Sequence, residues 1–191
     1  MNEVLKYGGD VFLSAVHKLY TVVFDSEVFP VQWAQGIIVP LFKGGAEDFR
    51  YDPGKYRGIT LLSVLGKTYT AVLNNRLSNW IENNNILADE QAGFRPNRSI
   101  TDQLFVLTET IRNRRPNKTF CAFLDIQKAY DKVWREGLWY KLYKAGVRGK
   151  LWRIIRGIYA KVESCVALGD NLTTFFEILV VNRSSFKYIE G

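Results

Sequence analysis

Apolar residues recur at helical spacing in three stretches of the chain, and each stretch predicts a helix. The first covers residues 10–24, and Pro30 ends that region. The second covers residues 63–81, with Trp80 expected in the core, and the third covers residues 101–112. In the helix at 10–24 the apolar positions are Val11, Phe12, Ala15, Leu19, Val22 and Val23. In the helix at 63–81 they are Leu65, Tyr69, Val72, Leu73, Leu77 and Trp80. In the helix at 101–112 the inward positions are Leu104, Leu107, Thr108 and Ile111.

The last two predicted helices lie over residues 138–143 and 151–160. Gly146 and Gly149 separate them, and Trp139 and Trp152 are expected to be packing residues. Strand patterns occupy the remaining apolar stretches. Residues 37–42 predict a strand, and the turn signals at 44–45 and 52–54 suggest a hairpin or an exposed loop.

Three more strands are expected near the middle and the end of the chain. Residues 162–168 and 174–181 alternate as strands do, and Gly169-Asp170-Asn171 joins them. The apolar run Phe-Cys-Ala-Phe-Leu at 120–124 is typical of a short strand that is buried on both faces. The mixture of helices and strands predicts an α+β fold.

Composition narrows the class of protein. A chain of 191 residues with 47% hydrophobic content is large enough to bury one core of ordinary size. The formal net charge of +7 suits a protein that holds a phosphate backbone, although many other soluble proteins are equally basic. Cys121 and Cys165 lie in apolar strand-like segments, which favours buried free thiols over a disulfide or a zinc site and fits a reducing compartment.

Targeting signals do not stand out. No apolar run approaches the roughly 18 residues of a membrane span, and the first residues do not open a signal peptide. We therefore expect an intracellular protein without a membrane partner, in the nucleus or in the cytoplasm.

Asp125 follows the apolar run at 120–124 directly, and core packing does not explain a carboxylate there. Hard cations such as Mg²⁺ take oxygen ligands of this kind, completed by phosphates and water. In phosphoryl transfer with two metal ions, carboxylates hold the metals and no protein nucleophile is needed. The alternative is that Asp125 caps a following helix.

Four blocks occur in an order that resembles the reverse transcriptases of non-LTR (LINE-type) retrotransposons. The resemblance runs over roughly residues 5–178, and its catalytic block is Phe-Leu-Asp-Ile-Gln-Lys-Ala-Tyr-Asp-Lys-Val at 123–133. The other blocks are Trp33 with residues 36–45, then residues 56–62, then Gln-Ala-Gly-Phe-Arg at 91–95 with Ser99 and Asp102.

The resemblance implies the fingers and an incomplete palm of a right-hand polymerase that copies RNA into DNA. Residues 1–118 would form the fingers region with an upstream helix, 119–180 a partial palm, and 181–191 an unassigned tail. The implied partners are an RNA template, a DNA primer and deoxynucleoside triphosphates, with two Mg²⁺ ions in the complete enzyme.

The resemblance also implies roles for single residues. Asp125 would be the catalytic carboxylate and a metal ligand, together with the backbone carbonyl of Ile126. Tyr130 would exclude a ribose 2′-hydroxyl by its bulk, which favours deoxynucleotides. The expected nucleotide contacts are Lys43, Arg57, Lys128, Ala129 and Tyr130, and the expected nucleic-acid contacts are Gln91, Gly93, Phe94 and Arg95.

Simpler readings stay open for several of these residues. Lys43, Arg57 and Lys128 would then be solvated cations, and Tyr130 would pack against its own helix. Phe94 is expected to pack its loop rather than stack on a base. Asp131 is expected to cap or to form a salt bridge rather than bind metal.

The family pattern continues with a Gly- and Gln-rich segment and then an Ala-Asp-Asp turn, and neither precedes Gly191. We therefore expect this isolated chain to lack polymerase activity, because a two-metal centre needs those acids. Two alternatives are a catalytically dead module that still binds nucleic acid and a decayed relic that does not fold stably.

Overall fold

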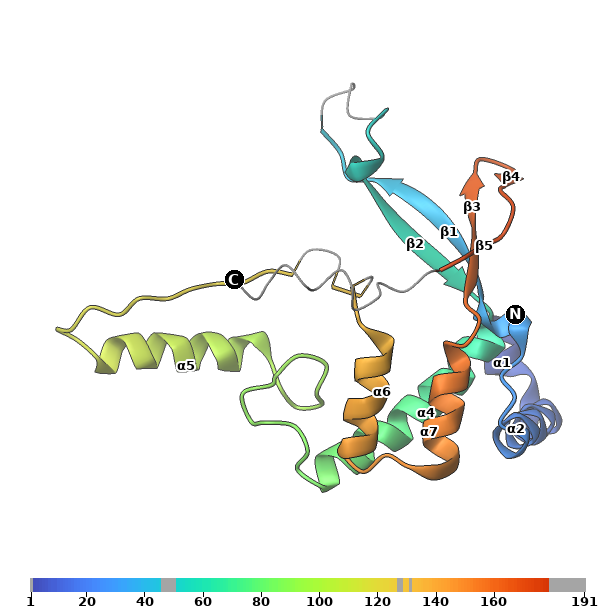
Figure 1. Cartoon of the computed structure of the whole chain (residues 1–191), viewed down its shortest axis with the longest axis horizontal. Helices are drawn as coiled ribbons and strands as arrows, with labels where there is room; N and C mark the ends of the chain where they lie inside the picture. Colours follow the sequence, from blue (N-terminus) through green and yellow to red (C-terminus); the bar gives the residue numbers. More distant parts are fainter. Residues whose placement is uncertain (1, 46–50, 127–128, 131, 179–191) are drawn as a thin grey trace. The chain divides into compact units, whose positions relative to one another are not determined.

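The computed structural model describes residues 2–45, 51–126, 129–130 and 132–178 (Figure 1). Its backbone forms two compact units. The first comprises Met1–Leu73 with Asp131–Gly191, and the second comprises Asn74–Tyr130. These units do not follow the expected division at residue 118, so the fingers and palm segments stay a prediction.

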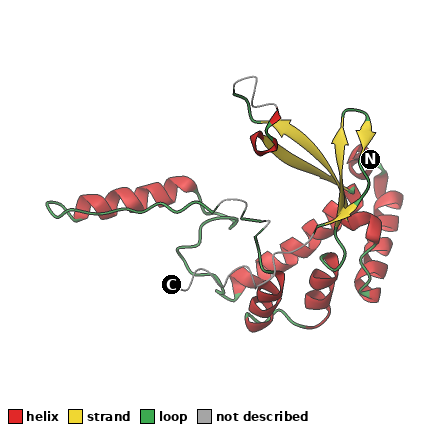
Figure 2. Ribbon diagram, turned by 45° about the horizontal axis from the view of Figure 1, so that its top comes forward, coloured by secondary structure: helices red, strands yellow, loops and turns green. Residues whose placement is uncertain are grey.

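Helices and short strands build the first unit (Figure 2). The predicted helices at 10–24, 63–81, 138–143 and 151–160 are confirmed, each with slightly wider or shifted bounds. The helices are α1 (Asn2–Tyr7), α2 (Gly9–Ser26), α3 (Val31–Ala34), α4 (Val64–Asn83), which continues into the second unit, α6 (Arg135–Lys144) and α7 (Gly149–Ile158), with the short 3-10 helix η2 (Pro53–Lys55).

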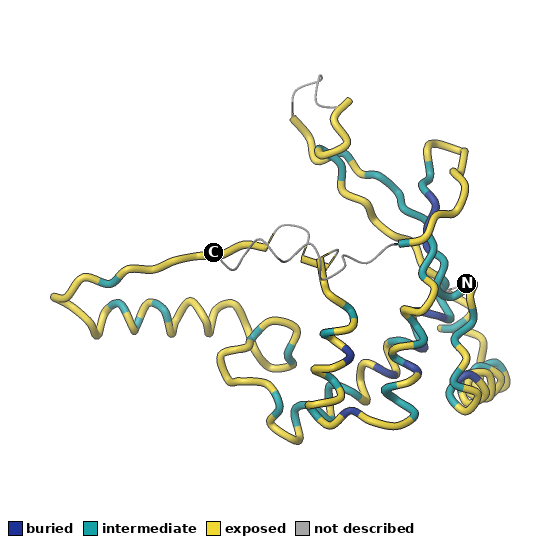
Figure 3. The backbone as a smooth tube through the Cα atoms, viewed as in Figure 1, coloured by how far each residue is buried: buried dark blue, intermediate teal, exposed yellow. Residues whose placement is uncertain are grey.

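The core of the first unit lies where α2, α4 and α7 pack together (Figure 3). Val23, Tyr69, Leu73 and Ile154 are its buried members. Around them pack the partly buried side chains of Tyr20, Phe24, Phe29, Trp33, Leu151 and Ile158. Only part of the α2 apolar pattern faces this core, because Val11, Ala15, Leu19 and Val22 are exposed. Trp139 is buried, as expected, and Trp152 and Trp80 are half-buried.

Close approach between α3 and α4 explains a glycine in the helical pattern. A Cβ atom at Gly66 would lie 2.9 Å from the Cβ of Trp33, so no larger residue fits without movement. The rings of Trp33 and Tyr69 lie 5.8 Å apart, and the Tyr20 hydroxyl donates to the Leu65 carbonyl at 2.9 Å. These contacts tie α2, α3 and α4 together.

The sheet has the order β2-β1-β3-β4, and β5 pairs with β3. β1 (Gln35–Phe42) and β2 (Tyr56–Leu62) form an antiparallel hairpin, which confirms the predicted strand at 37–42. β3 (Glu163–Leu168) runs parallel to β1 and confirms the prediction for 162–168. The final strands are shorter than expected: β4 (Asn171–Leu172) and β5 (Phe176–Glu177) are two residues each, and residues 179–181 lie outside the described part of the chain.

In the second unit, α5 (Ile100–Asn113) confirms the helix predicted at 101–112. Its first turn carries a capping box: the Ser99 hydroxyl accepts from the Asp102 amide, and the Asp102 carboxylate accepts from the Ser99 amide. Leu104 is exposed rather than inward-facing, while Leu107 and Ile111 are half-buried.

The strand predicted at 120–124 is wrong. These residues pair with no strand in the described part of the chain, and Phe123 and Leu124 are 83% and 96% exposed. An apolar segment becomes a buried strand only when neighbouring strands satisfy its amides and cover its side chains, and here nothing described supplies them. Cys121 is accordingly exposed, against expectation, whereas Cys165 on β3 is fully buried as expected.

None of the helices in the described residues is long and apolar enough to cross a membrane.

Candidate functional site

The distal end of the β1–β2 hairpin carries two of the predicted cations. The register pairs Leu41 with Arg57, and Lys43 follows Leu41 by two residues. Lys43 is the first residue after β1 and Arg57 is the second residue of β2, so both cations belong to the same end of the hairpin. The Lys43 ammonium donates to the Gly54 carbonyl at 3.0 Å, and the Lys43 amide donates to the Lys55 carbonyl at 2.8 Å. Both cations are exposed, and an anion has access to them.

Arg95 organises the loop between α4 and α5. Its guanidinium donates from Nε to Glu82 Oε1 at 2.9 Å and from Nη2 to Oε2 at 2.7 Å. Nη1 donates to the carbonyls of Ala88 and Gln91 at 2.9 and 3.2 Å. The Arg95 side chain is only 9% exposed, so its donors serve the loop itself. This role differs from the expected phosphate contact, which stays a prediction.

The ion pair shifts the pKa of each partner in the direction that favours its charged form. The hydrogen bonds from Arg95 are the main reason that the pKa of Glu82 lies below its ordinary value, and burial opposes them in part. The same hydrogen bonds raise the pKa of Arg95. The pair is therefore ionised throughout the neutral range, and the loop keeps its brace there.

Phe94 is presented to solvent by this braced loop, which corrects the expectation that it packs the loop. Its side chain is 95% exposed and its backbone has a φ of 62°, in the left-handed region that bulky residues rarely adopt. Gln91 Nε2 donates to the Gly93 carbonyl at 3.2 Å, which fixes the turn before Phe94. An aromatic ring held outward in this way is available for stacking on a base.

Asp125 and Ile126 lie in the extended, exposed segment that precedes residues 127–128. A Mg²⁺ ion prefers several oxygen ligands. Within the described residues, no three Asp, Glu, His or Cys side chains come together as a metal group, so this part of the chain does not fit a complete metal site. Ala129 and Tyr130 lie in an exposed turn, and Lys128 and Asp131 lie outside the described residues.

Glu82 was not identified by sequence reasoning, and nothing in its immediate pattern marks it. Its pairing with Arg95 depends on how the chain folds back over 13 residues. The capping box was visible in principle, because Ser99 and Asp102 have the Ser-x-x-acid spacing of a helix start.

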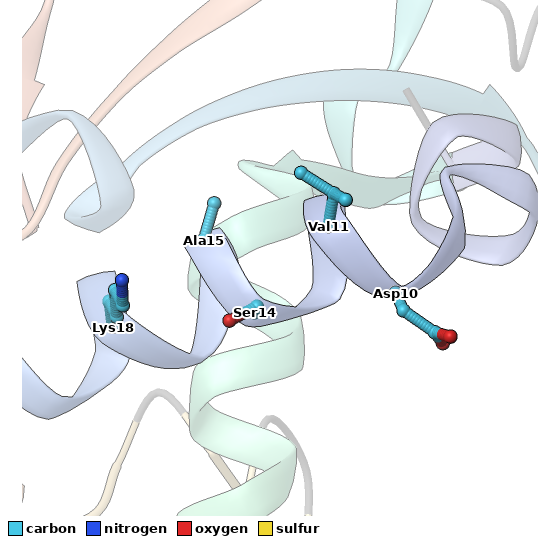
Figure 4. Close-up of a pocket in the computed structure, with 5 residues that line it drawn as sticks. All are labelled: Asp10, Val11, Ser14, Ala15 and Lys18. Carbon is cyan, nitrogen blue, oxygen red and sulfur yellow. The ribbon is translucent and has the colours of Figure 1, made fainter.

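A shallow open hollow on α2 is lined by Asp10, Val11, Ser14, Ala15 and Lys18 (Figure 4). All five residues belong to one helix, and a single helix face does not enclose a ligand. None of the predicted site residues lines it.

Comparison with known proteins supplies a family. The model of the family described as "Reverse transcriptase (RNA-dependent DNA polymerase)" matches residues 43–182. This range contains every residue that we expected from the sequence to contact metal, nucleotide or nucleic acid.

Curated relatives from Drosophila melanogaster are named as RNA-directed DNA polymerases of transposable elements. The chain is 35% identical over 128 residues to a probable RNA-directed DNA polymerase from transposon BS, covering 66% of this chain and 14% of the relative. It is 34% identical over 149 residues to that of transposon X-element, covering 71% of this chain and 16% of the relative. It is 31% identical over 142 residues to the RNA-directed DNA polymerase from mobile element jockey, covering 73% and 15%. The chain thus spans no more than about one sixth of the length of these relatives.

Proposed function

Because this chain belongs to the reverse transcriptase (RNA-dependent DNA polymerase) family and is of the LINE type, we propose that it supplies the fingers and part of the palm to an enzyme that extends DNA on an RNA template. The observation that carries the proposal is the family match over residues 43–182, which includes the hairpin cations, the Phe94 loop and Asp125.

The hairpin cations bind the incoming triphosphate in this proposal. Lys43 provides a point charge on a flexible stem, and Arg57 provides a planar fork that matches phosphate oxygens. Their exposure at the same end of the hairpin supports the assignment, because two cations neutralise more phosphate charge than one. Lys128 and Ala129 complete the nucleotide contacts, and Tyr130 selects the deoxyribose.

Template binding falls to the loop at 91–95. Phe94 stacks on a template base, and Gln91 and Gly93 shape the turn that presents it. Arg95 holds the loop through Glu82, and we rank its direct phosphate contact below this bracing role because its donors are already engaged.

Asp125 is the proposed catalytic carboxylate and, with the Ile126 carbonyl, the proposed contribution of this segment to Mg²⁺ binding. The described residues do not form a complete metal site, so we assign no chemical step through the metal. The same observation supports a second function, in which the isolated chain binds template and primer without copying.

The test is a chimaera in which residues 43–178 replace the matching segment of the jockey polymerase. Primer extension on an RNA template with Mg²⁺ and deoxynucleotides should persist in the chimaera and be lost in its Asp125→Asn form. The matched control is Asp170→Asn, an exposed acid in the turn between β3 and β4, which should leave extension unchanged.

The isolated chain is tested in parallel. Binding of the primer–template without incorporation would support the binding function for the chain alone. Incorporation that Asp125→Asn abolishes would instead assign a working metal centre to the chain alone. A folded Asp125→Asn chimaera that extends primers normally would refute the role of Asp125.

A further inference from the structure

The segment that contains α6 and α7 concentrates the positive charge of the chain. Residues 135–161 carry eight Lys and Arg residues and one acid, Glu136, a surplus of seven. The formal net charge of the whole chain is also +7, so the other residues carry equal numbers of both signs. None of the nucleotide or template contacts proposed above lies in this segment.

Three of the eight cations are paired with acids from elsewhere in the first unit. Lys150 Nζ lies 2.8 Å from Asp25, Arg153 lies 2.5 Å from Glu27, and Lys161 lies 3.3 Å from Glu163. The other five have no carboxylate within 4.0 Å in the described part of the chain; they are Arg135, Lys141, Lys144, Arg148 and Arg156. Two classes of cation therefore share the same helix α7.

Most of these five cations lie over an aromatic ring. Arg148 lies 4.9 Å from the centre of the Tyr143 ring, and Arg156 lies 5.5 Å from that of Trp152. Tyr143 and Trp152 meet edge to face at 6.3 Å. Trp152 and Arg156 are four residues apart on α7, so they share one face of the helix. Arg148 directly precedes α7, and Arg148 and Trp152 both contact the Tyr143 ring. We call Tyr143, Arg148, Trp152 and Arg156 the α7 stripe.

A hydrogen bond holds Trp152 of the stripe in place, and two further cations of this segment lie over aromatic rings. Trp152 Nε1 donates to the carbonyl of the buried Trp139 at 3.1 Å, which holds the indole in place under Arg156. Beside the stripe, Lys144 lies 5.6 Å from the Tyr140 ring. Arg135 lies 5.3 Å from the Tyr159 ring.

This arrangement determines what the arginines can bind. A guanidinium stacked on a ring keeps its N–H edge free for hydrogen bonds, and the stacking restrains the long side chain before any ligand arrives. Phosphate oxygens match that edge. Cations interleaved with aromatic rings, here the exposed Tyr143 and the half-buried Trp152, are the pattern that tracks the backbone of a single strand.

We propose that the α7 stripe binds the phosphate backbone of single-stranded RNA, at a surface additional to the site that holds template and nucleotide. Binding is insensitive to base sequence, because guanidinium edges contact phosphates and not base edges. The proposal does not depend on polymerase activity.

The experiment measures anisotropy of a fluorescent single-stranded RNA on the full chain over a range of salt concentrations. The variant Arg148→Gln/Arg156→Gln should weaken binding by on the order of tenfold at low salt and reduce the salt slope by about 1.4, the value for two phosphates of a single strand. Lys150→Gln/Arg153→Gln removes the same charge from the same segment but from carboxylate-paired cations, and should change binding little. Circular dichroism checks that both variants are folded.

Two further arms identify the ligand. Duplex DNA and heparin should bind more weakly than the RNA. If the stripe variant weakened the binding of all three ligands equally, the stripe would attract polyanions in general and the proposal would be wrong. Photo-cross-linking of a 4-thiouridine RNA to the unmodified chain should label Tyr143 or its peptide. Absence of RNA binding, equal weakening by the two double variants, or cross-links confined to the Phe94 loop would each overturn the proposal.

Discussion

The Arg95 guanidinium grips the Glu82 carboxylate with two parallel hydrogen bonds of 2.9 and 2.7 Å. A bidentate pair fixes orientation as well as distance, so it holds the loop in one geometry. The remaining Arg95 donor group reaches the Ala88 and Gln91 carbonyls. One side chain thus determines the shape of the segment that presents Phe94.

Glu82→Gln should loosen this loop. The amide has one acceptor oxygen in place of two and carries no charge, and its NH₂ group faces a guanidinium donor, so the bidentate pair is lost while the shape of the side chain is kept. Limited trypsin digestion should then cut faster after Arg98, which lies at the end of the loop. Glu109→Gln is the control, because Glu109 pairs with Arg112 on the surface of α5 and should not affect that cleavage. Equal rates in the parent and Glu82→Gln would show that the fork does not restrain the loop.

Stability should fall in acid. The pKa values of Glu27, Glu82 and Glu163 are lowered, chiefly by hydrogen bonds from Arg153, Arg95 and Gln35, from an ordinary value of 4.5. The folded state therefore binds fewer protons, and the stability that these carboxylates contribute is present above that value and lost as the pH falls through their folded pKa values. Urea unfolding between about pH 7 and about pH 3 should show this decline. It should be shallower in Glu27→Gln, whereas an identical slope would exclude a contribution from Glu27.

Phe94→Ala should weaken binding of an RNA template and leave stability unchanged. Stacking on one base contributes about 1–3 kcal/mol, so the dissociation constant should rise by about 5- to 150-fold. A side chain that is 95% exposed loses no packing when it is truncated. Phe105→Ala, an exposed aromatic on α5, tests whether any exposed ring has the same effect. If Phe94→Ala binds as the parent does, the stacking role is wrong.

Ile154→Ala should destabilise the first unit by about 2–5 kcal/mol, because truncating a buried side chain loses apolar contact and leaves a cavity. Ile154 is 2% exposed and packs with Val23, Tyr69 and Leu73. Ile100→Ala removes the same atoms from an 81% exposed site and should cost little. Chemical denaturation monitored by circular dichroism measures both changes. Similar losses in the two variants would contradict the assignment of the core.

The helices were predictable because their signal is local. Periodic apolar residues at 63–81 and 101–112 predict helices whatever they pack against. The strand prediction at 120–124 failed because an apolar run becomes a strand only beside other strands, and no described strand pairs with it. Burial also depends on neighbours, which is why Val11 and Leu104 lie exposed within correct helices.

The site shows the same limit. Residue type and position identified Asp125 as a group that suits metal, the resemblance implied the roles of Lys43 and Arg57, and the family match includes all three. The partner of Arg95 and the outward direction of Phe94 depend on the tertiary path of the loop, which no local pattern encodes.

The parallel pairing of β1 with β3 also bears on how the chain folds. Gln35 Nε2 donates to Glu163 at 3.0 Å across 128 residues of sequence, and the register continues from Gly36 with Ser164 to Ile38 with Val166. During synthesis the β1–β2 hairpin leaves the ribosome well before β3 has been made. The edge of β1 that pairs with β3 is therefore unpaired at first. Contacts of such high sequence separation form slowly, and an open edge meanwhile invites pairing with another chain. The edge of β1 is therefore a place where co-translational aggregation of this protein is expected.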